Sequence, residues 1–421
     1  MPRDPASDPV SARRASRRRL LRGAGGLAAL VATGGLLGCQ PTTSPTSGAA
    51  KPAAEPPKAP QPTAPAAAQP TEATKPNATA DPPREMTMFV YSGLTERAYR
   101  ELFVPNFEAQ SGVKATLDPG WWDMAPKLKV SPSDQTPFDL VMTDPTQGFP
   151  GIRDGLFTKV DLERIPNAKR FAPRILDSWI YKESWGVPYI SSAMTLAWNK
   201  DLLTTPLKSW GDLFSEGLKG EIMLFSSYYM SLYTFAAAKA SLDGKPGAAR
   251  QMIEQDLDAV FQFAREKRDW VKFWWPDTAG AVQALLLNNV KAGNIHGNGL
   301  IKPIAEGKPL DLVIPVEDRA YVQLFFLVPQ NTRSVRVAED AINFVAGPDF
   351  QRGLADTTGE LASNIPEVAA DVAPRNPLWA KVYPHTQQDW DNLNYYPYDA
   401  YDRQLSKITD FWNRDVLRKS S

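Results

Sequence analysis

Residue types that carry catalytic or metal chemistry are sparse in this chain. Its two histidines, His296 and His385, lie far apart and lack the His-Glu-x-x-His spacing of a zinc enzyme. No Gly-x-Ser-x-Gly elbow, phosphate-binding loop or dinucleotide fingerprint occurs. Carboxylates that are distant in sequence could still meet in the fold as an acid/base pair, so a catalytic carboxylate such as Asp123 or Asp144 remains an alternative. The pattern favours binding over catalysis, so we expect a protein that is not an enzyme and uses no cofactor or metal.

Cys39 is the only cysteine, and it follows a signal-like segment. Six arginines between Arg13 and Arg22 precede a glycine-rich apolar run at 23–37, which is shorter than the roughly 20 residues of a membrane helix. We interpret residues 1–38 as a lipoprotein signal peptide of the twin-arginine type, with Sec export as the alternative. Leu36-Leu37-Gly38-Cys39 resembles the bacterial lipobox. The sequence predicts an exported lipoprotein, anchored to the bilayer through acylated Cys39 on the periplasmic or cell-surface side.

Residues 39–84 form a separate region after the signal peptide. From position 40 to 84 the chain is rich in proline and alanine and has no aromatic residue, leucine, isoleucine or valine. Such a composition cannot bury a core, so we expect a disordered, extended linker. Residues 85–421 are long enough for two domains. Acidic and basic residues balance at 47 each, which gives no reason to expect a nucleic-acid partner, and we expect a monomer.

Hydrophobic periodicity in the remaining chain alternates between strand and helix. Buried strands are predicted at 87–91, 139–142, 221–225 and 312–314. Helical spacing of apolar residues predicts helices over 252–261, 279–286 and 338–345. This alternation is typical of an α/β protein.

Nine segments, in order along the chain, resemble one family of transport proteins. They are Val90-Tyr91-Ser92-Gly93-Leu94, Phe107-Glu108-Ala109-Gln110-Ser111-Gly112-Val113, Phe138-Asp139-Leu140-Val141, Trp185-Gly186-Val187-Pro188-Tyr189, Leu196-Ala197-Trp198-Asn199, Ser209-Trp210-Gly211-Asp212-Leu213, Leu218-Lys219-Gly220-Glu221-Ile222, Phe326-Leu327-Val328-Pro329 and Trp412-Asn413-Arg414. Together they resemble the extracytoplasmic solute-binding proteins of ABC importers, in the spermidine/putrescine-binding and ferric-binding-like branch of the type II periplasmic binding proteins.

The resemblance implies two α/β lobes, joined by two crossing strands, that close over a ligand. We place lobe 1 at 85–195 and 322–421, and lobe 2 at 196–321. The implied function is capture of a small-molecule solute in the cleft between the lobes and its delivery to an ABC permease. A secreted enzyme or a ligand sensor on the same two-lobed scaffold is the alternative.

This chain departs from the family where the ligand is held. The stretch that carries acids in polyamine binders is Phe225-Ser226-Ser227-Tyr228-Tyr229-Met230 here, and a further aspartate corresponds to Leu324. Where ferric-binding relatives have adjacent tyrosines, this chain has His296-Gly297-Asn298. We therefore expect a small polar organic solute, neutral, zwitterionic or anionic, and keep polyamine or ferric-ion binding as alternatives.

The candidate ligand contacts come from the presumed cleft ends of strands, from helix starts and from the crossing strands. They are Ser92, Gly93, Trp122, Asp123, Asp144, Tyr189, Ser191, Ser226, Ser227, Tyr228, Trp275, His296, Asn298, Tyr321 and Gln323. In each of the pairs Trp121-Trp122 and Trp274-Trp275 we expect one ring to face the cleft and the other to pack. Capping of a helix by Ser226 or Ser227 is compatible with ligand contact, and helix packing is an equal alternative for Tyr228-Tyr229.

Overall fold

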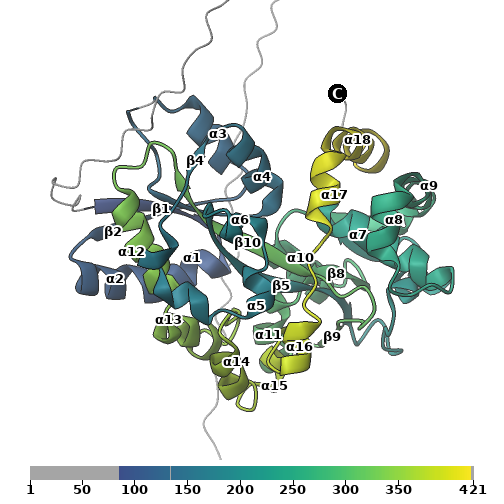
Figure 1. Cartoon of the computed structure of the whole chain (residues 1–421). Coiled ribbons are helices and arrows are strands. Elements are labelled where there is room, and N and C mark those ends of the chain that lie inside the picture. Colours follow the sequence, from purple (N-terminus) through teal and green to yellow (C-terminus); the bar gives the residue numbers. More distant parts are fainter. Residues whose placement is uncertain (1–84, 133, 419–421) are drawn as a thin grey trace, which may run out of the picture. The chain divides into compact units, whose positions relative to one another are not determined.

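The structure is a computed structural model, and it describes residues 85–132 and 134–418. The predicted signal peptide, Cys39 and the linker through residue 84 lie outside these described residues. All described residues fall within one compact unit of the chain (Figure 1). In this part of the chain, no helix has both the length and the apolar character needed to cross a membrane.

Ten strands of the described chain form one sheet. They are β1 (Glu85–Tyr91), β2 (Lys114–Gly120), β3 (Leu140–Thr143), β4 (Phe157–Thr158), β5 (Gly186–Asn199), β6 (Ile222–Phe225), β7 (Val271–Trp275), β8 (Ala292–His296), β9 (Leu310–Val313) and β10 (Tyr321–Pro329). The strand order is β2-β1-β3-β10-β5-β8-β6-β7, with β4 paired to β10 and β9 paired to β5.

Helices cover the sheet. The α-helices are α1 (Leu94–Ala98), α2 (Val104–Ser111), α3 (Met124–Val130), α4 (Pro145–Arg153), α5 (Pro173–Leu176), α6 (Trp179–Lys182), α7 (Tyr228–Leu242), α8 (Ala249–Gln255), α9 (Leu257–Lys267), α10 (Thr278–Leu286), α11 (Asn298–Ala305), α12 (Val335–Val345), α13 (Pro348–Arg352), α14 (Pro366–Val372), α15 (Pro377–Val382), α16 (Gln387–Asp391), α17 (Tyr398–Arg403) and α18 (Leu405–Phe411). Shorter 3-10 or π segments are η1 (Tyr99–Phe103), η2 (Leu162–Arg164), η3 (Pro166–Arg170), η4 (Trp210–Phe214), η5 (Glu216–Leu218), η6 (Arg268–Trp270), η7 (Gly353–Thr357) and η8 (Trp412–Val416).

Two parallel groups of strands define two lobes, as predicted. In the first lobe β1 runs parallel to β2 and β3, and in the second β6 runs parallel to β7 and β8. The long strands β5 and β10 are antiparallel to each other and join the lobes. The predicted lobe limits at 195 and 322 fall inside these two strands, and this division of the chain stays a prediction.

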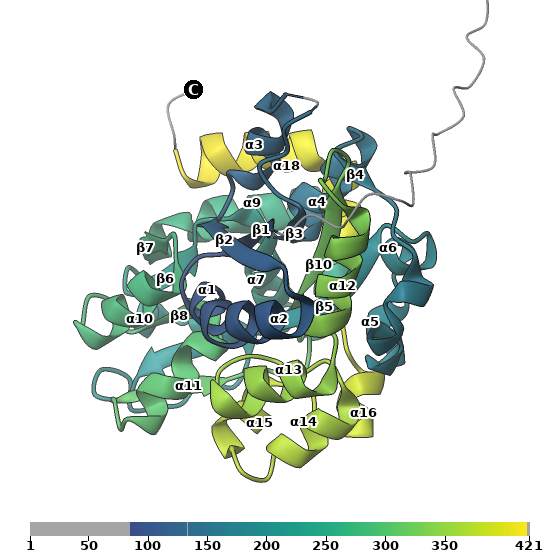
Figure 2. The ribbon, with the colours of Figure 1, turned by 90° about the vertical axis from the view of Figure 1, so that its left-hand side faces the viewer.

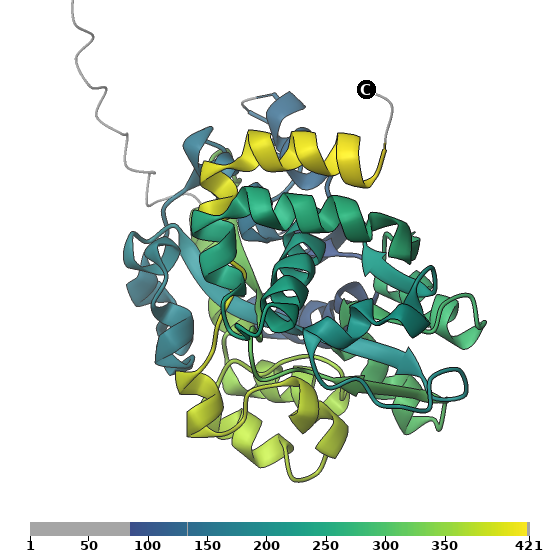
Figure 3. The same ribbon diagram turned by 90° about the vertical axis from the view of Figure 1, so that its right-hand side faces the viewer.

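Helix α7 is the central helix of the second lobe. Its 15 residues bury aromatic, aliphatic and alanine side chains around the whole helix, from Tyr229 to Ala240. A helix that is apolar on all sides must be enclosed. The views from the two sides show α1 and α2 over the first lobe (Figure 2) and α7, α8 and α9 over the second lobe (Figure 3).

The predicted strands and most predicted helices are confirmed. Strands β1, β3, β6 and β9 contain or overlap the four predicted apolar runs, and α10 and α12 match two predicted helices. The third predicted helix, over 252–261, is wrong in one respect because it is divided into α8 and α9. Asp256, between them, has φ −141° and leaves the helical region, so the helical pattern of apolar residues continues across a backbone break.

The C-terminal elements α17, α18 and η8 pack against the second lobe, although the predicted division places them in lobe 1. The ring of Phe411 stacks on Phe261 of α9 with centroids 3.8 Å apart. The Tyr401 hydroxyl donates a 2.9 Å hydrogen bond to the carbonyl of Tyr229 in α7. Figure 3 shows the yellow C-terminal helix alongside the green helices of this lobe. The same segment contacts the first lobe through the ion pair between Arg153 and Asp402.

One buried carboxylate ties three separate segments of the first lobe together. Asp139 is 2 % exposed and accepts hydrogen bonds from the backbone amides of Thr87 at 2.8 Å and Arg333 at 3.1 Å. The Arg333 guanidinium forms an ion pair with the same carboxylate. Because the Asp139 carboxylate is removed from water, these hydrogen bonds and the ion pair are needed to offset the free-energy cost of burying its charge.

We predict that Arg333→Ala lowers the free energy of unfolding by about 3 kcal/mol, because it leaves a buried carboxylate without its cation. Urea unfolding of both proteins measures this difference. The matched control is Arg352→Ala, since Arg352 pairs with Asp371 and both side chains are nearly half exposed. That change should cost no more than about 1 kcal/mol. Equal losses in the two variants would contradict the assignment.

Candidate functional site

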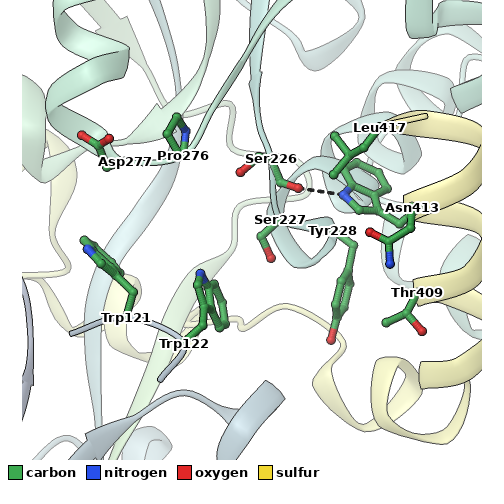
Figure 4. Close-up of a pocket in the computed structure, with 11 residues that line it drawn as sticks. Trp121, Trp122, Ser226, Ser227, Tyr228, Pro276, Asp277, Thr409, Asn413 and Leu417 are labelled. Carbon is green, nitrogen blue, oxygen red and sulfur yellow. Dashed lines mark hydrogen bonds between the residues drawn. The ribbon is translucent and has the colours of Figure 1, made fainter. Parts of the chain in front are cut away.

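A cleft with a volume of about 570 Å³ opens between the two lobes (Figure 4). Its lining residues come from the loop after β2, from the ends of β6 and β7, and from the C-terminal helices. They are Trp121, Trp122, Ser226, Ser227, Tyr228, Pro276, Asp277, Thr409, Trp412, Asn413 and Leu417. The volume lies within the range of about 300–1,000 Å³ that is typical of small-molecule sites.

A tight turn after β2 presents the two tryptophans of the first lobe. Asp123 accepts a 3.0 Å hydrogen bond from the amide of Trp121 and pairs with Lys127 at 2.9 Å. Gly120 is required here, because a Cβ atom would lie 2.3 Å from the Asp123 carboxylate. The carboxylate of Asp123 therefore holds the turn and is not among the groups that line the cleft.

Both tryptophans of this turn line the cleft, which corrects the expectation that one of them packs inside. Trp121 is 39 % exposed and Trp122 is 45 % exposed. The expectation assumed that side chains alternate between two faces, as in a strand. Strand β2 ends at Gly120, so the alternation no longer applies at the next two residues. Trp121 also packs on Tyr91, with ring centroids 5.4 Å apart.

The second lobe contributes the segment that links β6 to α7. Ser227 occupies the N-cap position of α7, but its side chain makes no capping hydrogen bond. The carbonyl of Ser226 accepts a 2.8 Å hydrogen bond from the Trp412 indole, which fixes the C-terminal segment against this edge of the cleft (Figure 4). Both serine side chains line the cleft, and Tyr228 begins the helix beside them.

Buried Asn294 holds this edge in place. Its amide group donates to the hydroxyls of Ser231 at 3.1 Å and Thr234 at 2.8 Å, and its oxygen accepts from the amide of Phe225 at 2.8 Å. The indole of Trp275 donates to the Asn294 carbonyl at 2.9 Å. Trp275 is completely buried. Its predicted ligand contact stays a prediction, and this burial argues against it.

Asp144 and Tyr189 are buried and are not among the residues that line the cleft. Asp144 caps α4 by accepting from the amide of Thr146 at 2.8 Å, and it also accepts from the Tyr91 hydroxyl at 2.7 Å. Burial raises the pKa of Asp144. Tyr189 is 8 % exposed, and its ring stacks on Phe326 of β10. A second cavity beside Thr146 has a volume of only about 10 Å³, which is about the smallest that can hold one water molecule.

His296 ends β8 among aromatic rings. Its ring centroid lies 5.6 Å from that of Phe225 and 5.7 Å from that of Trp275. The Tyr229 hydroxyl lies 3.4 Å from His296 Nε2, and Nδ1 is buried with no hydrogen-bond partner among the described residues. Burial lowers the pKa of His296 to about 4, so the imidazole is neutral near pH 7.

The cleft brings together Trp122, Ser226, Ser227 and Tyr228 of the predicted ligand contacts. The other predicted contacts are not among the residues that line the cleft. Ser92 and Gly93 precede α1, Asn298 begins α11, Ser191 lies on β5, and Tyr321 and Gln323 lie on β10. All the proposed ligand contacts stay predictions.

Sequence reasoning missed most of the C-terminal side of the cleft. Asp277 carried a readable signal, since an aspartate before an apolar helical pattern is a common N-cap, and it does cap α10 by accepting from Gly280 at 2.8 Å. Thr409, Asn413 and Leu417 had no such signal. They reach the cleft only because the last helices pack on α7 and α9.

Comparison with known proteins identifies the family. Residues 103–381 match the model of the bacterial extracellular solute-binding proteins. The chain belongs to this family. Spermidine/putrescine-binding periplasmic proteins are among its relatives. The one from Salmonella typhimurium is 21 % identical over 315 residues, covering 73 % of this chain and 84 % of the relative. The one from Escherichia coli (strain K12) is 21 % identical over 294 residues, covering 68 % and 80 %.

Solved structures show the same two-lobed fold. A putative spermidine/putrescine ABC transporter from Listeria monocytogenes has a TM-score of 0.62 and 18 % identity, covering 80 % of this chain and all of that one. A lipoprotein of Treponema pallidum has a TM-score of 0.62 and 18 % identity, with 79 % and 100 % covered. The fold and family predicted from the sequence are confirmed. The protein is a solute-binding component of an ABC transporter, and its relatives are transport proteins.

We predict that His296 makes the stability of this solute-binding protein pH-dependent. Between about pH 6.5 and pH 4 the unfolded chain takes up a proton at this residue that the folded protein excludes. The free energy of unfolding therefore falls as the pH falls through this window, by up to about 1.4 kcal/mol per pH unit from this group.

Urea unfolding of the wild type and of His296→Gln across this window measures the effect. The free energy of unfolding of the wild type minus that of His296→Gln should fall steadily from pH 6.5 to pH 4 and stay constant above pH 7. Tyr229→Phe is the control, because it removes the hydroxyl beside His296 and keeps the imidazole. A His296→Gln curve parallel to the wild type would contradict the burial of a neutral imidazole.

Proposed function

We propose that this protein is a lipid-anchored binding subunit that captures a small polar organic solute between its lobes and delivers it to an ABC permease. The observation that carries the proposal is the cleft, which is open to solvent, large enough for a metabolite and lined from both lobes. Aromatic rings with a few polar groups are the usual lining of sites for small organic molecules. The membership of the family supports the same role.

The lining argues against a polyamine. Each ammonium group that leaves water needs a charged or strongly polar partner. Among the described residues that line the cleft, Asp277 is the only carboxylate, and one of its oxygens already caps α10. The relatives named for spermidine and putrescine therefore share the fold of this chain without fixing its solute.

The cleft lining offers few ligands for a ferric ion. Iron(III) is held by several hard oxygen donors at once. The described residues that line the cleft include a single tyrosine, Tyr228, and a single carboxylate, Asp277. In addition, no group of three or more His, Cys, Asp or Glu residues in the described chain is placed to hold a metal.

We predict that a small polar solute stabilises the full-length protein. A ligand that binds only the folded state raises the free energy of unfolding by about 2.7 kcal/mol at a concentration one hundred times its Kd. Thermal unfolding with a panel of polar metabolites, polyamines and ferric citrate measures the change in Tm. A panel that leaves Tm unchanged throughout would contradict the proposed function, and a shift with polyamines alone would restore the polyamine alternative.

We predict that the membrane attachment depends on Cys39. Diacylglycerol addition requires the thiol, so Cys39→Ser should move the protein from the membrane fraction to the soluble extracytoplasmic fraction. Fractionation and labelling with a radioactive fatty acid measure the two effects. Ser47→Ala in the linker is the matched control and should stay lipidated. A Cys39→Ser protein that remains lipidated would contradict the anchor.

A further inference from the structure

The charge of the cleft restricts the solute further than its size does. Among the described residues that line it there is no lysine, arginine or histidine, and Asp277 is their only acid. A charged group loses most of its hydration in such a site and needs an opposite charge to compensate. A strongly charged solute would find no free ionic partner on this lining.

Two helices begin at the cleft, and their N-termini disfavour the binding of a cation. The N-terminus of α7 follows Ser227, and the N-terminus of α10 follows Asp277. The amino end of a helix carries a partial positive charge, which offsets the one carboxylate and repels an ammonium group. The two N-termini therefore weaken the binding of quaternary amines, which the aromatic rings alone would attract.

The aromatic rings supply faces for a ring-shaped ligand. Trp122 is 45 % exposed, and it flanks the same open space as Tyr228 from the opposite lobe (Figure 4). The negative face of an indole attracts the polarised C–H groups on one side of a sugar ring. A flat surface of this kind on an otherwise uncharged lining suits a molecule with both an apolar face and polar edges.

Neutral hydrogen-bonding groups complete the lining. Ser227 offers a hydroxyl that makes no capping hydrogen bond to α7. Asn413 offers an exposed amide with both donors and an acceptor. The hydroxyl of Thr409 donates to the carbonyls of its own helix, which leaves its oxygen as an acceptor. Such groups can both donate to and accept from hydroxyls, which matches a polyhydroxylated solute.

We infer that the cleft takes a neutral, polyhydroxylated ring compound, a monosaccharide, a short oligosaccharide or a cyclic polyol, stacked on Trp122 and hydrogen-bonded by Ser227 and Asn413. The inference rests on the proposed function and narrows its solute class. It places the apolar face of the ring on the indole and the hydroxyls on the edges of the cleft.

The test is calorimetric titration of the full-length protein with neutral sugars and cyclic polyols, and in parallel with sugar acids, glycine betaine and polyamines. We expect saturable binding in the first group alone. Binding confined to sugar acids or glycine betaine would overturn the inference and leave the proposed function standing, and binding confined to polyamines would overturn the inference and restore the polyamine alternative. Absence of binding by every compound would count against both.

Variants then test the contacts with the best-binding sugar. Trp122→Ala should raise the Kd about tenfold, and Trp122→Phe should restore much of the affinity, because a ring face remains. Asn413→Asp should weaken binding of a neutral sugar, whereas it would strengthen binding of a cation. Trp185→Ala is the control, since this indole lies outside the cleft beside Lys159. Unchanged Kd values for Trp122→Ala and Asn413→Asp, with Tm preserved, would overturn the inference.

Discussion

The arrangement of this protein depends on β5, a single strand shared by both lobes. Its first half pairs with β10, in a register that sets Leu324 opposite Tyr189, and its second half pairs with β8 and β9. Because one continuous backbone carries both sets of hydrogen bonds, the two parallel groups of strands cannot shift independently. The edges that carry Trp122 and Ser227 therefore face one another as a consequence of strand pairing far from either residue. Any widening of the cleft must be absorbed by bending or twisting of β5 and β10 and by the segment around α17, which contacts the first lobe through Asp402 and the second through Tyr401.

Charges and cleft are separated in this molecule. Buried carboxylates serve the framework: Asp139 ties β1 to the segment after β10, and Glu339 is 3 % exposed and pairs with Arg164 at 2.8 Å. The described cleft lining, by contrast, presents indoles, hydroxyls, an amide and one carboxylate, that of Asp277. Desolvating a charge is costly unless a partner is fixed beside it, so the protein fixes such partners within its core. The neutral solute proposed above would meet one described ionic group in the cleft, Asp277, and one oxygen of that carboxylate already caps α10.

The sequence was sufficient for the fold and for part of the site. Short apolar runs such as 222–225 are strands because both faces are buried, and ordered family segments revealed the two-lobed design. Local pattern failed where the backbone changes conformation within a continuous apolar pattern, at Asp256, and where a strand ends, before Trp121. It could not predict the place of Asn413, because contacts between distant segments bring that residue to the cleft, such as Phe411 on Phe261 and the Trp412 indole on the Ser226 carbonyl. Local periodicity holds no information about such distant contacts.

The C-terminal side of the cleft is held by contacts between segments that are far apart in the chain. The Trp412 indole is bound to the carbonyl of Ser226 across 186 positions, and Phe411 stacks on Phe261. This wall is therefore not continuous in sequence with either β6 or β7, and detachment of the C-terminal helices would remove it while leaving both sheets intact.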